Sequence, residues 1–366
     1  MKACAALGHE VSLATVSDPC AEAIEGLILA HHFKLAEGSP VAAALPARWL
    51  QRRFRSFWGL SNTVLANLQA AAAECHADAV IAIGLDALPY LPPLSGTVRV
   101  WYPADEWIWH HVSQFRPFDR TTWGNLRDAA IKGVYERAHR RVVDRSWVVS
   151  DTEQRAMRWL AGMRHVDVLP LGVDQDFYQP SNEEPEPRTA VFWGRLDFGP
   201  NIQALDWFAD RVWPLVRRQA SDARFTIIGF NPGPEITRLA AIEGISIRPN
   251  VPDLRDLARR HSVLVLPLVS GGGMKNKLLE GAAMGLPIVC TPLAAQGLQE
   301  MSTSLLEIHS KPQAFANAIL ELWRDNAKRR EAGRAARTWV TTHHSWAGTA
   351  ARAIASLGKN QPVSRD

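Results

Sequence analysis

Short apolar runs rich in β-branched residues recur along the chain. They occupy residues 11–16, 79–84, 97–102, 145–150, 189–194, 224–229, 245–250, 262–268 and 287–291. Each run is continuously apolar, as in strands of parallel sheets that are covered on both faces. Between the runs, residues 201–218, 254–261 and 276–284 carry apolar side chains at helical spacing. The pattern predicts an α/β fold whose parallel sheets are built from right-handed βαβ units.

A change of pattern near the middle of the chain predicts two domains. Residues 181–188 (SNEEPEPR) are acidic and proline-rich without periodicity, which is typical of a connection. We therefore expect domains over 1–168 and 169–342, with 343–366 forming a helix that packs back on the first domain and a tail. The chain opens with a helical pattern, so we expect the first domain to lack the N-terminal strand of a doubly wound fold.

The strongest chemical motif joins a strand, a glycine turn and a helix that is expected to begin near Met274. Gly271–Gly273 let a ligand approach the backbone, and the N–H groups at a helix start favour an anion. Lys275 and Lys277 add positive charge, and Glu280 can accept hydrogen bonds from a ribose diol. A helix-starting turn followed by a solvated glutamate is the structural alternative. The P-loop spacing is absent, which disfavours ATP hydrolysis of that kind.

A second motif follows the strand at 189–194. Gly194 ends this strand and Arg195 comes next. Sites in parallel sheets lie beyond the carboxyl ends of the strands, where a guanidinium can bind a diphosphate through two hydrogen bonds. An arginine that is simply exposed in the loop is the alternative reading.

Several segments together resemble the family 4 retaining glycosyltransferases of the GT-B fold, closest to the sugar transferases of exopolysaccharide clusters. They are YERAHRRVVDRSWVVSDTE (135–153), GVD (172–174), GRLD…PN (194–201), IRPNVPDLRDL (247–257) and GGGMKNKLLEGAAMGLPIVCT…QGL (271–298). The resemblance implies two Rossmann-like domains facing a cleft, with the nucleotide sugar held by the second domain and the acceptor by the first.

The resemblance also implies a set of donor-binding residues. They are Gly194, Arg195, Asn250, Val251, Gly271, Gly272, Gly273, Met274, Lys275, Lys277, Leu279 and Glu280. In this reading Arg195 and Lys275 or Lys277 neutralise the diphosphate, Glu280 holds the ribose, and Asn250–Val251 lie near the base.

Two departures from the family pattern change these roles. Gly272 stands where the family often has the first glutamate of Glu-x7-Glu, so recognition of the donor sugar must come from elsewhere. Pro200 and Asn201 stand where a lysine is usual after the GRL segment. Neutralisation of the diphosphate then falls more heavily on Arg195 and the two lysines.

Few other segments of the sequence offer candidate catalytic or metal-binding residues. Residues 101–112 (WYPADEWIWHHV) follow a strand, and the resemblance suggests Asp105 as a catalytic group facing the acceptor; a capping aspartate is the alternative. The DQD at 174–176 matches a metal-binding pattern of a different fold, but it follows the interdomain turn. We expect no metal and no cofactor, because fixed positive groups stabilise the leaving diphosphate in this family.

Composition and charge indicate which kinds of ligand and surface the protein can bind. The 366 residues are 47% hydrophobic and 21% charged with a net charge of +4, which suits an anionic ligand without requiring nucleic acid. No signal peptide or apolar run of spanning length is evident, so we expect a cytoplasmic protein. Residues 47–60 interleave arginines with aromatic residues and are a candidate for peripheral contact with the inner face of the membrane, or else a helix docked on its own domain.

The sequence therefore predicts a metal-independent glycosyltransferase of hexosyltransferase type. It would move a sugar from a UDP- or GDP-linked donor to a saccharide or lipid-linked acceptor with retention, in surface polysaccharide biosynthesis. A nucleotide-sugar epimerase of the same fold and a degenerate, non-catalytic binding protein are the alternatives.

Overall fold

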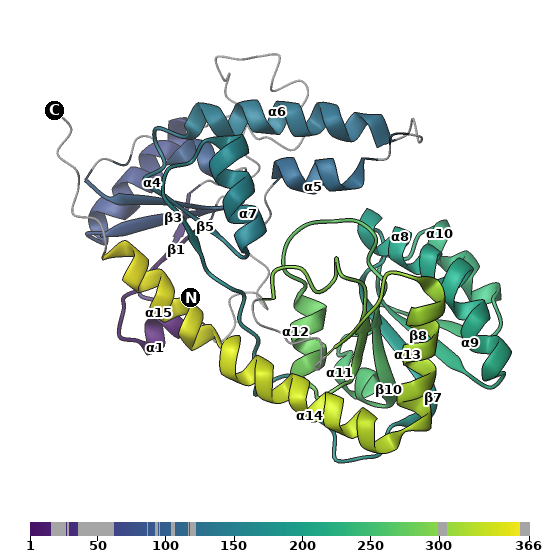
Figure 1. Cartoon of the computed structure of the whole chain (residues 1–366). Helices are drawn as coiled ribbons and strands as arrows, with labels where there is room; N and C mark the ends of the chain where they lie inside the picture. The colour runs from purple at the N-terminus through teal and green to yellow at the C-terminus, as the bar shows by residue number, and fades with distance from the viewer. Residues whose placement is uncertain are drawn as a thin grey trace. The chain divides into compact units, whose positions relative to one another are not determined.

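The chain forms two compact units in a computed structural model (Figure 1). Unit 1 comprises Met1–Pro170 and Ala347–Asp366, and unit 2 comprises Leu171–Trp346. The structure describes residues 1–15, 27, 29–35, 62–85, 87–91, 94, 96–103, 107–115, 117, 122–298 and 306–358. Asp105 and the segment 47–60 lie outside the described residues. None of the described helices is both long and apolar enough to span a bilayer.

Unit 1 contains a four-stranded parallel sheet in the order β3-β4-β5-β6 and a parallel pair β1-β2. The strands are β1 (Leu13–Thr15), β2 (His32–Lys34), β3 (Ala79–Ile83), β4 (Val98–Tyr102), β5 (Arg145–Val148) and β6 (Val166–Val168). The helical segments are α1 (Lys2–Ala6), α4 (Asn62–Glu74), η1 (Leu88–Tyr90), α5 (Trp107–Gln114), α6 (Trp123–His139), α7 (Asp151–Ala156), the π-helical η3 (Met157–Ala161) and α15 (Trp346–Leu357).

The C-terminal helix α15 completes a small core in unit 1. Ala353 packs with the buried side chains of Val100, Trp147 and Leu169. The Trp147 indole donates a hydrogen bond of 2.9 Å to Ser356 Oγ. Part of the core of unit 1 is therefore supplied by residues that follow unit 2 in the sequence.

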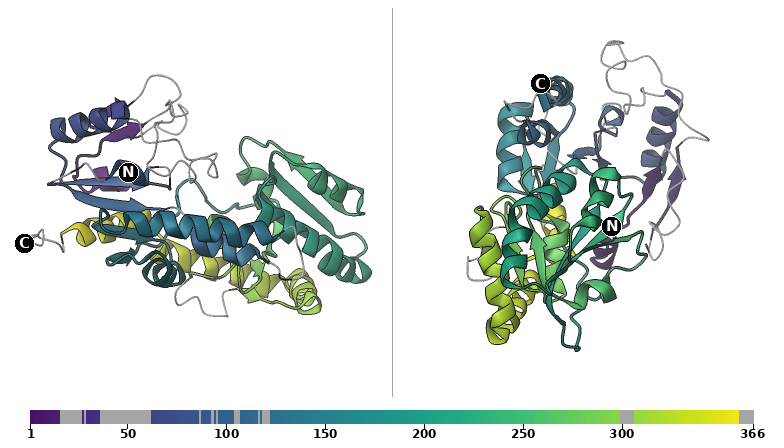
Figure 2. Two further views of the ribbon diagram at one scale, coloured as in Figure 1. Left: turned by 90° about the horizontal axis from the view of Figure 1, so that it is seen from above. Right: turned by 90° about the vertical axis from the view of Figure 1, so that its right-hand side faces the viewer.

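Unit 2 is built on a six-stranded sheet in the order β12-β11-β10-β7-β8-β9. The strands are β7 (Glu186–Arg195), β8 (Arg224–Phe230), β9 (Ile245–Pro249), β10 (His261–Leu266), β11 (Ile288–Cys290) and β12 (Glu307–Ile308), all paired in parallel. The helical segments are α8 (Gly199–Trp207), η4 (Phe208–Val212), α9 (Trp213–Gln219), α10 (Pro234–Thr237), η5 (Arg238–Ala241), α11 (Arg255–Arg259), α12 (Asn276–Ala283), α13 (Pro312–Arg324) and α14 (Asn326–His343). Helices flank this sheet on both sides (Figures 1 and 2).

The strand order places the centre of the sheet of unit 2 at β7. Its neighbours are β8, which follows it along the chain, and β10, which is reached by a longer connection. The order of the strands reverses here, and ligands of open α/β sheets bind beyond the carboxyl ends of the strands at such a point. Gly194 and Arg195 end β7, and the glycine turn Gly271–Gly273 follows β10.

The predicted fold class, α/β with parallel sheets, is confirmed. Two predicted elements differ in detail. Helix α12 begins at Asn276, later than the expected start near Met274, because Gly271 and Gly273 have φ of 96° and 71° and Lys275 is extended. The helix predicted over 201–218 contains the π-helical segment η4 between α8 and α9.

Candidate functional site

A pocket of about 240 Å³ lies within unit 2 beside the carboxyl ends of β7 and β8. It is lined by Tyr178, Trp193, Gly194, Arg195, Ile228, Gly229, Phe230, Val251, Leu254, Asn276, Lys277 and Glu280. The lining combines apolar side chains with one carboxylate and two cations. Ligand pockets typically have this composition, with a few polar groups fixing the orientation of the ligand.

Lys277 on α12 supplies a partly buried cation. Its Nζ donates a hydrogen bond of 2.7 Å to Asn201 Oδ1 and lies 4.3 Å from the centroid of the Phe192 ring. Burial, together with the nearby charge of Lys275, lowers the pKa of Lys277 to about 7. The ammonium is held in place and is only partly compensated, so an anion in the pocket would favour its charged form.

Asn201 connects Lys277 to the turn that follows β7. This buried side chain donates from Nδ2 to the carbonyl oxygen of Arg195 at 2.7 Å and accepts from Lys277 through Oδ1. Asn201, in the region where the resemblance led us to expect a lysine, contacts a lysine of another element. The sequence alone did not indicate this contact, because the two residues are far apart along the chain.

Gly194 leaves the space that the Lys277 ammonium occupies. A Cβ atom on Gly194 would lie 2.8 Å from Lys277 Nζ and 3.0 Å from Asn201 Nδ2. Gly194 also has φ of 151°, in the region that glycine alone adopts readily. Both its conformation and its surroundings thus require glycine here.

Two aromatic residues, Trp193 and Tyr178, lie beside Glu280, and the sequence alone did not indicate either of them. The Trp193 indole donates a hydrogen bond of 2.7 Å to Glu280 Oε2, and the Tyr178 hydroxyl lies close to this carboxyl. Burial raises the pKa of Glu280, while the bond from Trp193 acts in the opposite direction. A carboxylate offers about four lone-pair positions, so the bond from Trp193 leaves acceptor capacity for a ligand.

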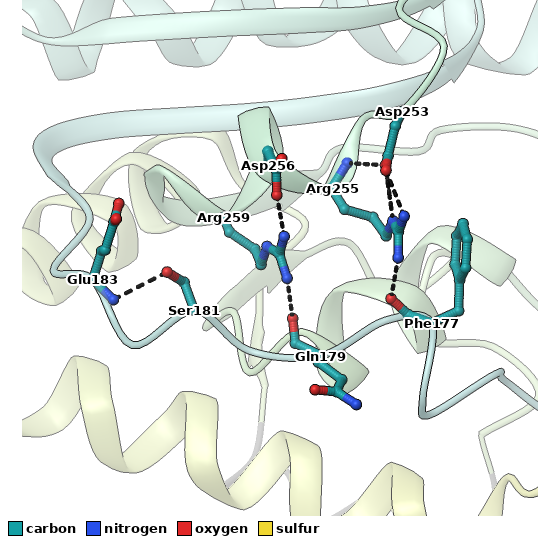
Figure 3. Close-up of polar contacts among 8 residues, drawn as sticks. All are labelled: Phe177, Gln179, Ser181, Glu183, Asp253, Arg255, Asp256 and Arg259. Carbon is teal, nitrogen blue, oxygen red and sulfur yellow. Dashed lines mark hydrogen bonds and ion pairs between the residues drawn. The ribbon is translucent and has the colours of Figure 1, made fainter.

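Two arginines of α11 fix the segment that carries Tyr178 (Figure 3). Arg255 donates from Nη1 to the carbonyl oxygen of Phe177 at 2.8 Å, and its guanidinium lies 3.5 Å from the centroid of the Phe177 ring. Arg259 donates to the carbonyl oxygen of Gln179 at 3.1 Å. The backbone is therefore held on both sides of Tyr178.

Two aspartates in turn hold these arginines. Asp253 accepts hydrogen bonds from the Arg255 guanidinium, including one of 2.8 Å from Nε, and from the Arg255 backbone N–H at 2.9 Å. These bonds lower the pKa of Asp253 to about 2. Asp256 pairs with Arg259. Asp253 is ionised at neutral pH, and these contacts hold both arginines in their orientation toward the backbone.

Arg195 lies in the pocket wall, but its side chain already has a partner. The guanidinium binds both carboxylate oxygens of Asp197, at 3.1 Å and 2.9 Å, and is 71% exposed. An arginine has five N–H donors, so three remain for another acceptor. Arg195 can bind a phosphate from this position only alongside the Asp197 pair or in exchange for it.

The other predicted donor-binding residues fall into two groups. Val251 lines the pocket, whereas Asn250, the glycine turn and Lys275 are not among its lining residues. Lys275 Nζ donates to the carbonyl oxygen of Gly272. Met274 and Leu279 are buried, so their side chains belong to the core of unit 2.

Two further details concern the loops around the pocket. The Ser270 hydroxyl, just before the glycine turn, is buried and has no hydrogen-bond partner among the residues that the structure describes.

Asp174, the first residue of the DQD segment, accepts hydrogen bonds from the backbone N–H groups of Asp176 and Phe177 at 3.2 Å and 2.9 Å. Asp174 therefore caps a turn.

Comparison with known proteins shows similarity to glycosyltransferases. Residues 187–325, which lie within unit 2, match the family described as glycosyl transferases group 1. The chain is 27% identical over 230 residues to D-inositol 3-phosphate glycosyltransferase of Paenarthrobacter aurescens, a match that covers 57% of this chain and 55% of that protein. The chain thus spans about half the length of this relative.

The solved structures that resemble the chain extend over both units. Sucrose-phosphate synthase of Thermosynechococcus elongatus matches 98% of this chain and 90% of its own with a TM-score of 0.71 and 16% identity. Anabaena HepE in complex with UDP and glucose matches 95% of this chain and 92% of its own with a TM-score of 0.63 and 14% identity. These likenesses concern the fold, which is mixed α/β with parallel sheets as in GT-B glycosyltransferases, and the sequence match to group 1 covers residues 187–325.

Proposed function

We propose that this chain is a retaining glycosyltransferase that uses a nucleotide sugar as donor. The observation that carries the proposal is the convergence of Glu280, Lys277 and Arg195 on one pocket of unit 2. One carboxylate with free acceptor capacity suits a ribose diol, and two cations suit a diphosphate. The apolar side chains of Val251 and Leu254 suit a nucleobase.

UDP is the nucleotide that we propose first, with GDP as the second choice. Anabaena HepE, which shares the fold, was solved with UDP and glucose. The acceptor in this proposal is a saccharide or a lipid-linked saccharide used in the assembly of surface polysaccharide. The reaction needs no metal and no cofactor, because Lys277 and Arg195 stabilise the charge that develops on the leaving diphosphate.

Calorimetric titration of UDP and GDP into Glu280→Gln tests the site. The amide that replaces the carboxylate can no longer accept two charged hydrogen bonds from the ribose, so the affinity should fall by about tenfold or more. Glu331→Gln is the matched control, because Glu331 is an exposed glutamate of α14 outside the pocket. Equal affinities in Glu280→Gln and the unaltered chain would exclude the proposed ribose contact.

Transfer itself needs a separate assay. Incubation with UDP-sugars and a panel of saccharide acceptors, with and without EDTA, should give a glycosylated product whose anomeric configuration matches that of the donor. Product that forms without any acceptor would point to epimerisation. Tight nucleotide binding without any product would point to a binding protein.

A further inference from the structure

Helix α6 of unit 1 presents an apolar stripe to solvent. Its exposed positions include Trp123, Leu126 and Val134, which are 55%, 40% and 54% exposed, and they are spaced as residues on one side of a helix. The helix packs against α5 on the outside of unit 1 (Figure 1). A surface helix normally turns its polar residues outward, so this stripe requires an explanation.

Arginines accompany the stripe, while acidic side chains are scarce beside it. Arg127, Arg137 and Arg141 are exposed along the same helix and its end. The acidic residues of α6 are Asp128, which pairs with Arg127 at 3.0 Å, and Glu136, which is buried. The exposed side of α6 therefore combines apolar and cationic groups.

The π-helical segment η3 extends this surface. Trp159 is 82% exposed and Leu160 is 40% exposed, and η3 packs against α6. Arg137 donates a hydrogen bond of 3.0 Å to the carbonyl oxygen of Leu160, which ties the two elements together. Arg155 and Arg158 are exposed and precede this tryptophan in the sequence. Neither forms an ion pair with any residue that the structure describes.

We propose that the basic aromatic face, which consists of Val134, Arg137, Arg141, Arg155, Arg158 and Trp159, docks unit 1 on an anionic phospholipid bilayer. Tryptophan favours the headgroup level of a bilayer, where its apolar ring is buried and its N–H stays hydrated. Arginines bind lipid phosphates and are attracted by the negative surface potential. A bilayer accommodates a projecting tryptophan without a matching pocket, which a folded acidic protein would have to supply.

This inference is independent of the proposed function. All residues of the basic aromatic face belong to unit 1, whereas every residue that lines the pocket belongs to unit 2. It also differs from the sequence-based candidate 47–60, which lies outside the described residues. Membrane binding and nucleotide binding can therefore be measured and can fail separately.

Co-sedimentation of the full chain with vesicles tests the proposal. We expect binding to vesicles that contain phosphatidylglycerol and little binding to pure phosphatidylcholine, with release as salt is raised. Arg141→Glu combined with Arg155→Glu should lower the partition coefficient by about tenfold or more. Val134→Ser combined with Trp159→Ser should also lower it, through the apolar contribution to binding.

The matched control is Arg211→Glu combined with Arg218→Glu. Both arginines are exposed on the helical segments η4 and α9 of unit 2, so this pair changes the net charge equally without touching the basic aromatic face. The circular dichroism spectrum and the melting temperature confirm that each variant is folded. Absence of sedimentation with anionic vesicles, equal binding to both vesicle types, or equal losses in the control pair would overturn the proposal.

Discussion

Lys277 carries the strongest pH dependence that we expect in the pocket. Its pKa is lowered to about 7, so the ammonium is largely neutral at pH 8 in the empty site. A bound diphosphate favours the charged form and raises that pKa. Above pH 7, binding of the donor is therefore accompanied by protonation of Lys277. Below pH 7, Lys277 is already protonated before the donor binds.

The affinity for UDP-glucose should fall as pH rises above 7, by up to about tenfold for each pH unit. Calorimetry between pH 6 and 9, in buffers of different ionisation enthalpy, measures both the affinity and the uptake of the proton. Lys277→Arg should flatten the profile, because a guanidinium stays charged over this range. An affinity that does not change from pH 6 to 9 in the unaltered chain would contradict the assignment of Lys277 to the diphosphate.

Gly194 offers a second test at the scale of one residue. Gly194→Ala places a methyl group against the Lys277 ammonium and requires an unfavourable φ, which costs about 1–3 kcal/mol. We expect a lower melting temperature and an affinity for UDP that is reduced by about tenfold, because Lys277 must move. Gly124→Ala is the control, since nothing lies near its Cβ position within α6. That variant should keep the full affinity.

At the scale of elements, the segment Phe177–Gln179 and helix α11 act together. Arg255 and Arg259 hold the backbone on both sides of Tyr178, so its hydroxyl is kept at Glu280. Tyr178 is in this sense a positioning residue. Its contribution should depend on whether the ligand carries the ribose hydroxyls.

Tyr178→Phe should weaken the binding of UDP severalfold, because the hydroxyl beside the Glu280 carboxyl helps to hold that carboxyl in place. The 2′,3′-dideoxy analogue of UDP should lose little, since it makes no hydrogen bond to Glu280 in either protein. Titration of both ligands into the unaltered chain and the variant forms a thermodynamic cycle. The cycle isolates the coupling between Tyr178 and the ribose hydroxyls. Equal losses for the two ligands would show that Tyr178 only supports the local structure.

The elements were more predictable from the sequence than the contacts of the site. Continuous apolar runs correctly indicated parallel strands, and the glycine turn correctly indicated a loop that leads into a helix. The contacts of Glu280 were not predictable, because Trp193 and Tyr178 come from other elements and have no local signal for this role. Asp197 beside Arg195 was visible in the sequence, yet their pairing depends on the geometry of the turn.

At the scale of the whole molecule, the two units have separate sheets and separate cores. The pocket lies in unit 2 alone, so a nucleotide should stabilise that unit selectively. At a UDP concentration of 100 Kd the gain is about 2.7 kcal/mol. This should raise the melting temperature of unit 2 by about 5–10 °C.

Differential scanning calorimetry of the full chain should therefore resolve two transitions, of which UDP moves one. The Glu280→Gln variant serves as the control, because a tenfold weaker affinity leaves a gain of only about 1.4 kcal/mol at the same UDP concentration, and its transition should move about half as far. If UDP shifted both transitions of the unaltered chain to the same extent, the units would unfold as one cooperative body. That result would contradict their thermodynamic independence.

The division of unit 1 along the chain sets an order for its synthesis on the ribosome. Residues Met1–Pro170 emerge first, but Ser356, which bonds to the Trp147 indole, lies beyond all of unit 2. Domains usually fold as units while the chain is being made. Unit 2 can therefore fold before α15 is synthesised, whereas the contact of Trp147 with Ser356 can form only afterwards. Of the two units, unit 1 begins first and is completed last.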